Sequence, residues 1–108
     1  LVWSGDIDSS FSSLRNQIVA GQNMGIAGIS WWTTDIGGFC GADISDPKFK
    51  ELLIRWFQFG TFCPVMRLHG YRKPFKKPIG TTGGGKNGSG ADNEIWSFGT
   101  DVLSNVIF

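Results

Sequence analysis

The chain has 108 residues, and 41% of them are hydrophobic, so it can bury one modest core and forms one domain or less. Ten Lys and Arg against nine Asp and Glu give a formal net charge of +1, which argues against nucleic acid or an anionic membrane as a partner. No stretch approaches the roughly 20 apolar residues of a membrane span.

The first predicted unit is a strand followed by a helix. Residues 1–3 are apolar and lead through a turn to Asp6, which is typical of a buried strand that ends in a loop. A helix is expected next, because a capping serine stands before apolar residues spaced at i, i+3 and i+7. The residues behind this prediction are Ser9 or Ser10 as the cap, Phe11, Leu14 and Ile18 as the stripe, and Gly21 and Gly25 as the end.

A second strand and a second helix follow. Residues 25–32 (GIAGISWW) are almost all apolar, as expected for a parallel strand that is covered on both faces, and Asp35 stands just beyond them. Asp46 then caps a helix with Pro47 in its first turn, and Gly60 ends this helix. A single apolar stripe marks it, at Phe49, Leu52, Leu53, Trp56 and Phe57.

The third unit is less regular. Residues 62–68 (FCPVMRL) form a strand-like run that delivers His69, although Pro64 fits a strand only near its start. Residues 70–91 are first basic and then rich in glycine, which predicts a long loop. A last helix is expected to begin near residues 92–93.

Two features of the long loop suggest binding sites that their context does not support. The glycines between residues 80 and 88 have the spacing of a phosphate-binding loop, but the required strand before them and helix after them are missing. The basic residues lack the interleaved aromatics of a nucleic-acid surface, so a solvated loop is the better interpretation. They are Arg72, Lys73, Lys76, Lys77 and Lys86.

The order of strand and helix predictions indicates repeated βα units around a parallel sheet. In such folds the carboxyl ends of the strands carry the chemistry, and Asp6, Asp35 and His69 each stand just beyond an apolar run. Three units cannot close an eight-stranded barrel, so the chain is either an open sheet or a part of a barrel whose other strands lie outside this sequence. We favour the partial barrel, which is an α/β fold.

Residue chemistry alone leaves the roles of these three residues open. Asp6 and Asp35 could be catalytic, could bind substrate hydroxyls, or could cap the helices that follow. His69 is the only histidine, which excludes a multi-histidine metal site and leaves a ligand-binding donor or a structural histidine. No metal and no cofactor is predicted. The run at residues 31–39 (WWTTDIGGF) favours a sugar pocket, because aromatics flank an acid and glycines allow close approach of the backbone.

Four motifs together resemble glycoside hydrolase family 31, the α-glucosidase and α-xylosidase family. They are WSGD at residues 3–6, WWTTDIGGF at 31–39, RWFQ at 55–58 and RLHG at 67–70. The resemblance spans nearly the whole chain and implies a (β/α)8 TIM barrel. Residues 1–108 would then be a fragment of the catalytic domain that supplies roughly the last three βα units. The tryptophan pair before Thr33 is more similar to α-xylosidase-type members than to the mammalian maltase type.

The resemblance also implies roles for single residues. Asp6 would be the general acid/base in a retaining hydrolysis of α-linked oligosaccharides or glycosides by double displacement. Asp35 and His69 would contact sugar hydroxyls, and Trp3 and Phe39 would form apolar walls. The nucleophilic aspartate of the family has no counterpart in this sequence, so we expect the chain to need the remainder of the barrel and to be inactive alone. A non-catalytic carbohydrate-binding fragment that uses its tryptophans as stacking platforms is the alternative.

Overall fold

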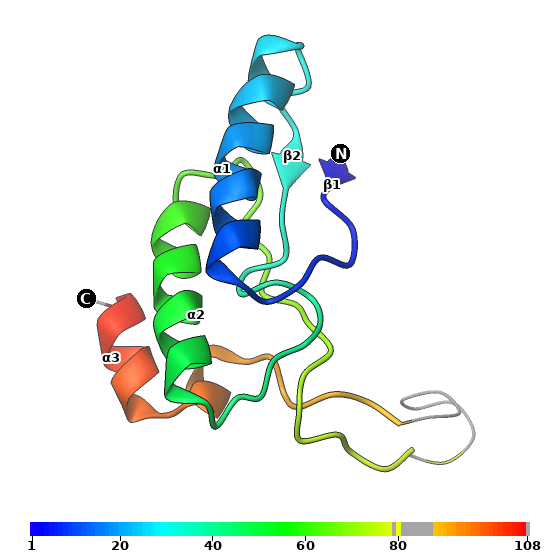
Figure 1. The fold of residues 1–108 in the computed structure, drawn as a ribbon, viewed down its shortest axis with the longest axis vertical. Coiled ribbons are helices and arrows are strands. Elements are labelled where there is room, and N and C mark those ends of the chain that lie inside the picture. Colours follow the sequence, from blue (N-terminus) through cyan, green and yellow to red (C-terminus); the bar gives the residue numbers. More distant parts are fainter. Residues whose placement is uncertain (79, 81–87, 108) are drawn as a thin grey trace.

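The computed structural model describes residues 1–78, 80 and 88–107 (Figure 1). The strands β1 and β2 pair in parallel, with Trp3 opposite Thr33, and the chain alternates between strand and helix as predicted as far as α2. Most of the glycine-rich stretch, residues 81–87 with Lys86, lies outside the described residues. The elements in chain order are β1 (Val2–Trp3), α1 (Phe11–Ile26), β2 (Trp32–Thr33), α2 (Pro47–Gly60), the 3-10 helix η1 (Ile95–Phe98) and α3 (Thr100–Ile107).

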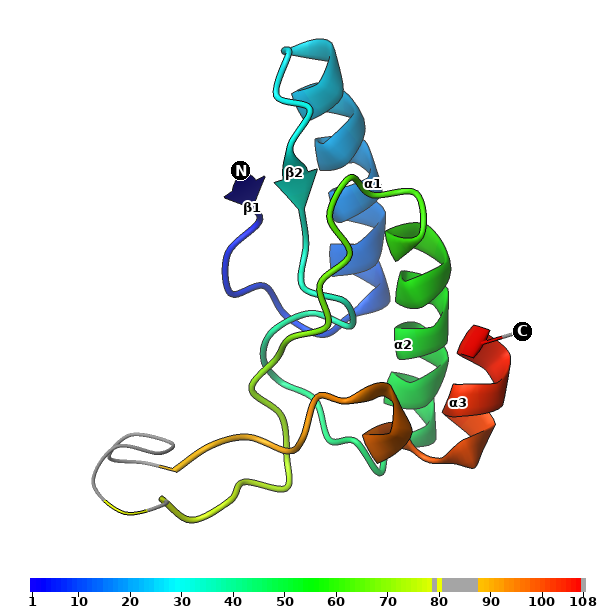
Figure 2. The ribbon, with the colours of Figure 1, turned by 180° about the vertical axis from the view of Figure 1, so that it is seen from behind.

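The long helices cover one face of the strand pair. Figures 1 and 2 show α1 and α2 side by side, with α3 packed against α2 on the side away from the strands. The strand β1 is exposed, since Val2 is 40% and Trp3 51% exposed, whereas Trp32 and Thr33 of β2 are only 4% and 1% exposed. The expectation that the second strand is covered on both faces is therefore confirmed for the short length over which β2 forms. Within that described part, no helix has the length and apolar character needed to cross a membrane.

The helix α2 forms as the sequence predicts. The Asp46 side chain accepts a hydrogen bond from the Lys48 amide at 2.9 Å, and Pro47 occupies a first-turn position where a backbone amide would have no helical partner. Every residue of the predicted stripe is buried, and Leu53 and Trp56 have no exposed surface. The stripe forms the centre of the hydrophobic core, which is completed by Leu14, Ile36, Ala42, Phe98 and Val102.

The second strand is much shorter than predicted, because α1 runs on to Ile26. The Gly28 amide donates to the Gly25 carbonyl at 3.1 Å and the Ile29 amide to the Met24 carbonyl at 2.9 Å, so these amides close the helix. Gly28 adopts the left-handed φ of +82° that this closure requires. The strand predicted over residues 25–32 is therefore wrong up to residue 31.

The predicted end of α1 at Gly21 is also wrong. Gly21 lies within the helix, where a Cβ atom would come within 2.9 Å of Cζ3 of Trp32. The absence of a side chain at this position lets β2 pack closely against α1. The predicted cap at the other end is confirmed, because the Ser10 hydroxyl accepts from the Ser13 amide at 3.1 Å.

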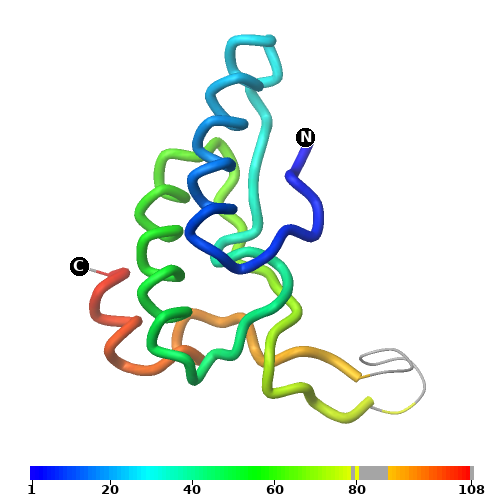
Figure 3. Tube along the Cα trace, viewed as in Figure 1, coloured from blue at the N-terminus to red at the C-terminus, as the bar shows by residue number. Residues whose placement is uncertain are grey.

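Residues 62–68 do not form the third strand, although they lie where it was expected. The amides of residues 61–63 bond to carbonyls of the last turns of α2, and Pro64 has no amide to offer. The run nevertheless returns alongside β2, as the trace in Figure 3 shows. There the Thr33 hydroxyl donates to the Val65 carbonyl at 2.7 Å, and the Ile36 amide donates to the Arg67 carbonyl at 3.0 Å.

The last helical region begins later than predicted. The 3-10 helix η1 starts at Ile95. The helical conformation is interrupted at Gly99, whose φ is +102°, before α3 begins. Asn93 starts no helix, because its side-chain amide donates instead to the Gly70 carbonyl at 2.9 Å and to the Ala91 carbonyl at 3.3 Å. The residue expected near the start of this helix thus contacts Gly70, which is distant in sequence.

Candidate functional site

Three loops meet at the carboxyl ends of the extended segments, and we call residues 4–9, 34–41 and 67–73 the rim. The Phe39 amide donates to the Ile7 carbonyl at 2.8 Å, which joins the first two loops. The Tyr71 amide donates to the Phe39 carbonyl at 2.6 Å, which joins the second to the third. The three rim loops carry, in order, Asp6, Asp35 and His69.

Asp6 is one of two exposed acids on the first rim loop, together with Asp8. Within the described residues no hydrogen bond or ion pair engages its carboxylate. Burial, and to a smaller extent repulsion from Asp6, raises the pKa of Asp35, so the two carboxyl groups lie within electrostatic reach of each other. An accessible and unengaged carboxyl group beside a second acid is able to donate or accept a proton at a bound ligand.

Asp35 is the buried acid of the rim, with no exposed surface. Arg67 lies beside it, with Nε 3.3 Å from Oδ1, but neither carboxylate oxygen has a hydrogen-bond donor among the described residues. Desolvation raises the pKa of Asp35, while Arg67 and His69 act to lower it. A buried carboxylate without donors is costly, so this arrangement leaves acceptor capacity that the folded chain itself does not use.

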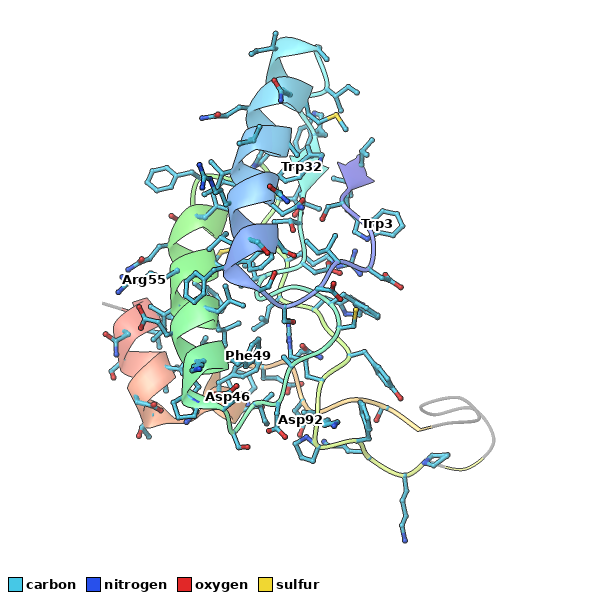
Figure 4. All side chains as sticks on the ribbon, viewed as in Figure 1. Trp3, Trp32, Asp46, Phe49, Arg55 and Asp92 are labelled. Carbon is cyan, nitrogen blue, oxygen red and sulfur yellow. The ribbon has the colours of Figure 1, made fainter. Side chains whose placement is uncertain are left out.

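His69 and Phe39 form the open side of the rim. Their ring centroids are 5.4 Å apart at an interplanar angle of 41°, and both residues border a cavity of about 420 Å³ that is also lined by Asn93. Trp3 pairs with Thr33, and in Figure 4 its side chain points away from α1.

The sequence prediction for Arg72 is wrong. It was assigned to a solvated basic loop, but its side chain is 1% exposed and is held by hydrogen bonds to three backbone carbonyls and to Asn93. A signal for this burial exists in the sequence, since Gly37 and Gly70 are both positions where a Cβ atom would crowd the guanidinium group. Sequence reasoning also missed Asn93, because its partners Arg72 and Gly70 are distant in sequence.

Metal binding has no basis in the described part of the chain. No group of three or more His, Cys, Asp and Glu side chains is close enough together there to hold an ion.

The burial of Asp35 leads to a prediction about stability. Asp35→Asn is expected to raise the melting midpoint of the chain at about pH 7 by about 4–8 °C, since removing a desolvated charge relieves on the order of 1 kcal/mol. A raised pKa means that the folded state holds the proton more tightly, so the penalty is full above the folded pKa and fades as the pH falls. The difference in melting midpoint between Asp35→Asn and the unmodified chain should therefore vanish toward about pH 4.

Circular dichroism melting at both pH values measures this difference. Asp43→Asn is the matched control, because hydrogen bonds from Ser45 lower the pKa of the exposed Asp43, and the change should lower the midpoint slightly at neutral pH. A lower midpoint for Asp35→Asn at neutral pH would show that the Arg67 pair outweighs the cost of burial.

Comparison with known proteins extends over nearly the whole chain. Residues 1–104 match the family model "Glycosyl hydrolases family 31 TIM-barrel domain". The chain is 70% identical over 74 residues to an uncharacterized family 31 glucosidase of Pseudescherichia vulneris, covering 68% of this chain and 14% of the relative. It is 44% identical over 79 residues to an α-xylosidase of Saccharolobus solfataricus, covering 70% and 11%.

A solved structure matches as well. It is a GH31 α-xylosidase from a soil metagenome, complexed with xylose, and it aligns with a TM-score of 0.87 at 63% identity. The alignment covers 98% of this chain and 16% of that one. The chain thus spans about one sixth or less of the length of the relatives it matches. These matches confirm the predicted fold class, an α/β segment of a TIM barrel.

Proposed function

The chain belongs to glycoside hydrolase family 31, and we propose that it supplies the acid/base side of the active site of a retaining α-glycosidase. In this proposal Asp6 protonates the departing glycosidic oxygen and later removes a proton from the water that releases the sugar. The observation that carries the proposal is the position of Asp6, an exposed carboxyl group on the same rim as Asp35 and His69.

The sugar is proposed to bind between the acids and the aromatic rings. His69 and the unused acceptors of Asp35 would take hydroxyl groups, and Trp3 and Phe39 would contact the apolar faces of the ring. An α-xyloside is the favoured substrate, because an α-xylosidase is among the relatives and the aligned structure is an α-xylosidase with xylose bound.

Double displacement also needs a nucleophilic carboxylate on the opposite side of the sugar. We propose that a different part of the complete barrel supplies it, so the catalytic unit is the complete enzyme that carries this segment. The separation of the two carboxyl groups in that enzyme would be about 5–5.5 Å, as in other retaining glycosidases.

Product stereochemistry tests the proposal. The complete enzyme is mixed with aryl α-xyloside, and proton NMR follows which anomer of xylose appears first. We expect the α-anomer, with kcat/KM for the xyloside about tenfold or more above that for the matching α-glucoside, since a pocket shaped for the smaller sugar excludes an added hydroxymethyl group. Initial release of the β-anomer, or the absence of any turnover, would contradict the proposal.

The binding-only alternative gives a different result. If the chain served as a carbohydrate-binding fragment, calorimetry of the isolated chain with xylose and glucose oligomers would show saturable binding. The complete enzyme would then release no product.

A further inference from the structure

Arg72 is the most highly connected polar side chain of the rim. Its Nη2 atom donates to the carbonyls of Ile36, Gly38 and His69 at 2.7, 2.6 and 2.9 Å. Its Nη1 atom donates to Oδ1 of Asn93 at 2.6 Å. The guanidinium carbon also lies 5.1 Å from the centre of the Phe49 ring on α2. One side chain therefore joins two rim loops to the segment before η1 and to the helical core.

The acceptors of Arg72 stand next to the proposed sugar contacts. Ile36 directly follows Asp35, Gly38 directly precedes Phe39, and the third carbonyl belongs to His69 itself. Any shift of the guanidinium group would therefore move the backbone from which these side chains project. Both Nη atoms of Arg72 already donate to acceptors within the chain, whereas the Asp35 oxygens have no donor among the described residues, so we assign ligand contact to Asp35 and not to Arg72.

The surroundings fit an arginine and no other residue. A planar guanidinium group offers donors in fixed directions, whereas an ammonium group is a compact point charge and cannot span the same four acceptors. A Cβ atom at Gly70 would overlap the guanidinium carbon, and one at Gly37 would come within 3.1 Å of Nη2. The glycines of the two motifs thus make the room that this side chain occupies.

The buried positive charge of Arg72 is stabilised by hydrogen bonds to its surroundings. Burial lowers the pKa of Arg72 to about 10, while the negative charge of Asp35 acts to raise it, so the group remains charged at neutral pH. Such a group is costly to bury unless its donors are satisfied. The two Nη atoms make four hydrogen bonds that meet most of that need and also bind the loops together, while Nε has no partner among the described residues.

We propose that Arg72 is a positioning residue of the active site, which fixes the distance between the loop of Asp35 and Phe39 and the loop of His69. The inference rests on the proposed glycosidase function. It assigns to Arg72 no contact with the substrate and no proton transfer, only control over the backbone that presents the sugar-binding side chains.

The test uses Arg72→Lys in the complete enzyme, because lysine keeps the charge and loses the fork of donors. We expect kcat/KM for an aryl α-xyloside to fall about 100-fold, with most of the loss in KM, since displacements of about 1 Å have effects of this size. The affinity for free xylose, measured by calorimetry, should fall in parallel. Val102→Ala is the control for stability, because Val102 is fully buried on α3 away from the rim.

If Arg72→Lys does not fold, Gly70→Ala is tested instead. The arginine itself is then unchanged, but the added methyl group pushes its guanidinium group out of position. Gly70→Ala should also raise KM and weaken xylose binding. Unchanged KM and xylose affinity in a folded variant would overturn the inference. It would also be overturned if Val102→Ala, at the same loss of melting midpoint, raised KM and weakened xylose binding as much as the Arg72 or Gly70 variant. Absence of turnover in the unmodified enzyme would instead count against the proposed function.

Discussion

Asp6→Asn in the complete enzyme is expected to lower kcat for alkyl or disaccharide α-xylosides by about 100- to 10,000-fold, which is the usual contribution of a general acid. Asparagine has nearly the same shape as aspartic acid but cannot deliver a proton to the departing oxygen. The loss in bond cleavage should shrink as the leaving group becomes more acidic, because an activated aryl group departs with little protonation. With such a substrate the glycosyl-enzyme should accumulate, since asparagine cannot activate water either.

A series of substrates with graded leaving groups measures this dependence in steady-state and burst experiments. Asp8→Asn is the matched control, because Asp8 is a second exposed acid on the same loop. It should retain the kcat of the unmodified enzyme. Undiminished turnover of a poor leaving group by Asp6→Asn would rule out the acid role, and an equal loss in Asp8→Asn would indicate damage to the loop.

Trp56→Ala is expected to destabilise the chain by about 3–5 kcal/mol, because it empties the space of the largest fully buried side chain in the core. In a chain of this size that loss corresponds to a fall in melting midpoint of at least about 12 °C. Trp56→Phe should cost far less, since the indole Nε1 has no hydrogen-bond partner among the described residues and its loss leaves no acceptor unpaired.

Circular dichroism melts of the three chains measure the effect. Arg55→Ala, next along the same helix, is the control, because Arg55 is on the exposed side and pairs with Glu51. Its loss should cost only about 0.3–0.5 kcal/mol. A midpoint for Trp56→Ala close to that of Arg55→Ala would mean that α2 does not pack on this core outside the complete barrel.

The features that the sequence predicts well are those set by local rules. The cap at Asp46, the proline after it and the apolar stripe of α2 depend on residues a few positions apart, and all are found. The expectation that polar residues after apolar runs meet at one edge also depends on a simple pattern. The structure brings the loops of Asp6, Asp35 and His69 into hydrogen-bonded contact, while their chemical roles stay predictions.

The features that the sequence predicts poorly are set by distant partners. The apolar run at 25–32 has the composition of a strand, but whether its amides pair with a neighbour or close α1 depends on Gly28 adopting a left-handed turn. Arg72 belongs to a basic stretch, and its burial depends on carbonyls that are more than 30 residues away at Ile36 and Gly38. Gly37 and Gly70 are a sign of a crowded site, but composition and spacing do not identify the acceptors.

The serial bonding of the rim, from Ile7 to Phe39 and from Phe39 to Tyr71, has a consequence for how such enzymes diversify. A change of loop length inside the bonded stretch would break a link and displace the neighbouring acid. Beyond Lys73 the chain turns away from the body of the molecule, as Figure 1 shows, and returns at Ser89. Changes of length between Lys76 and Ser89 would leave both rim links in place and cost little more than loop-closure entropy.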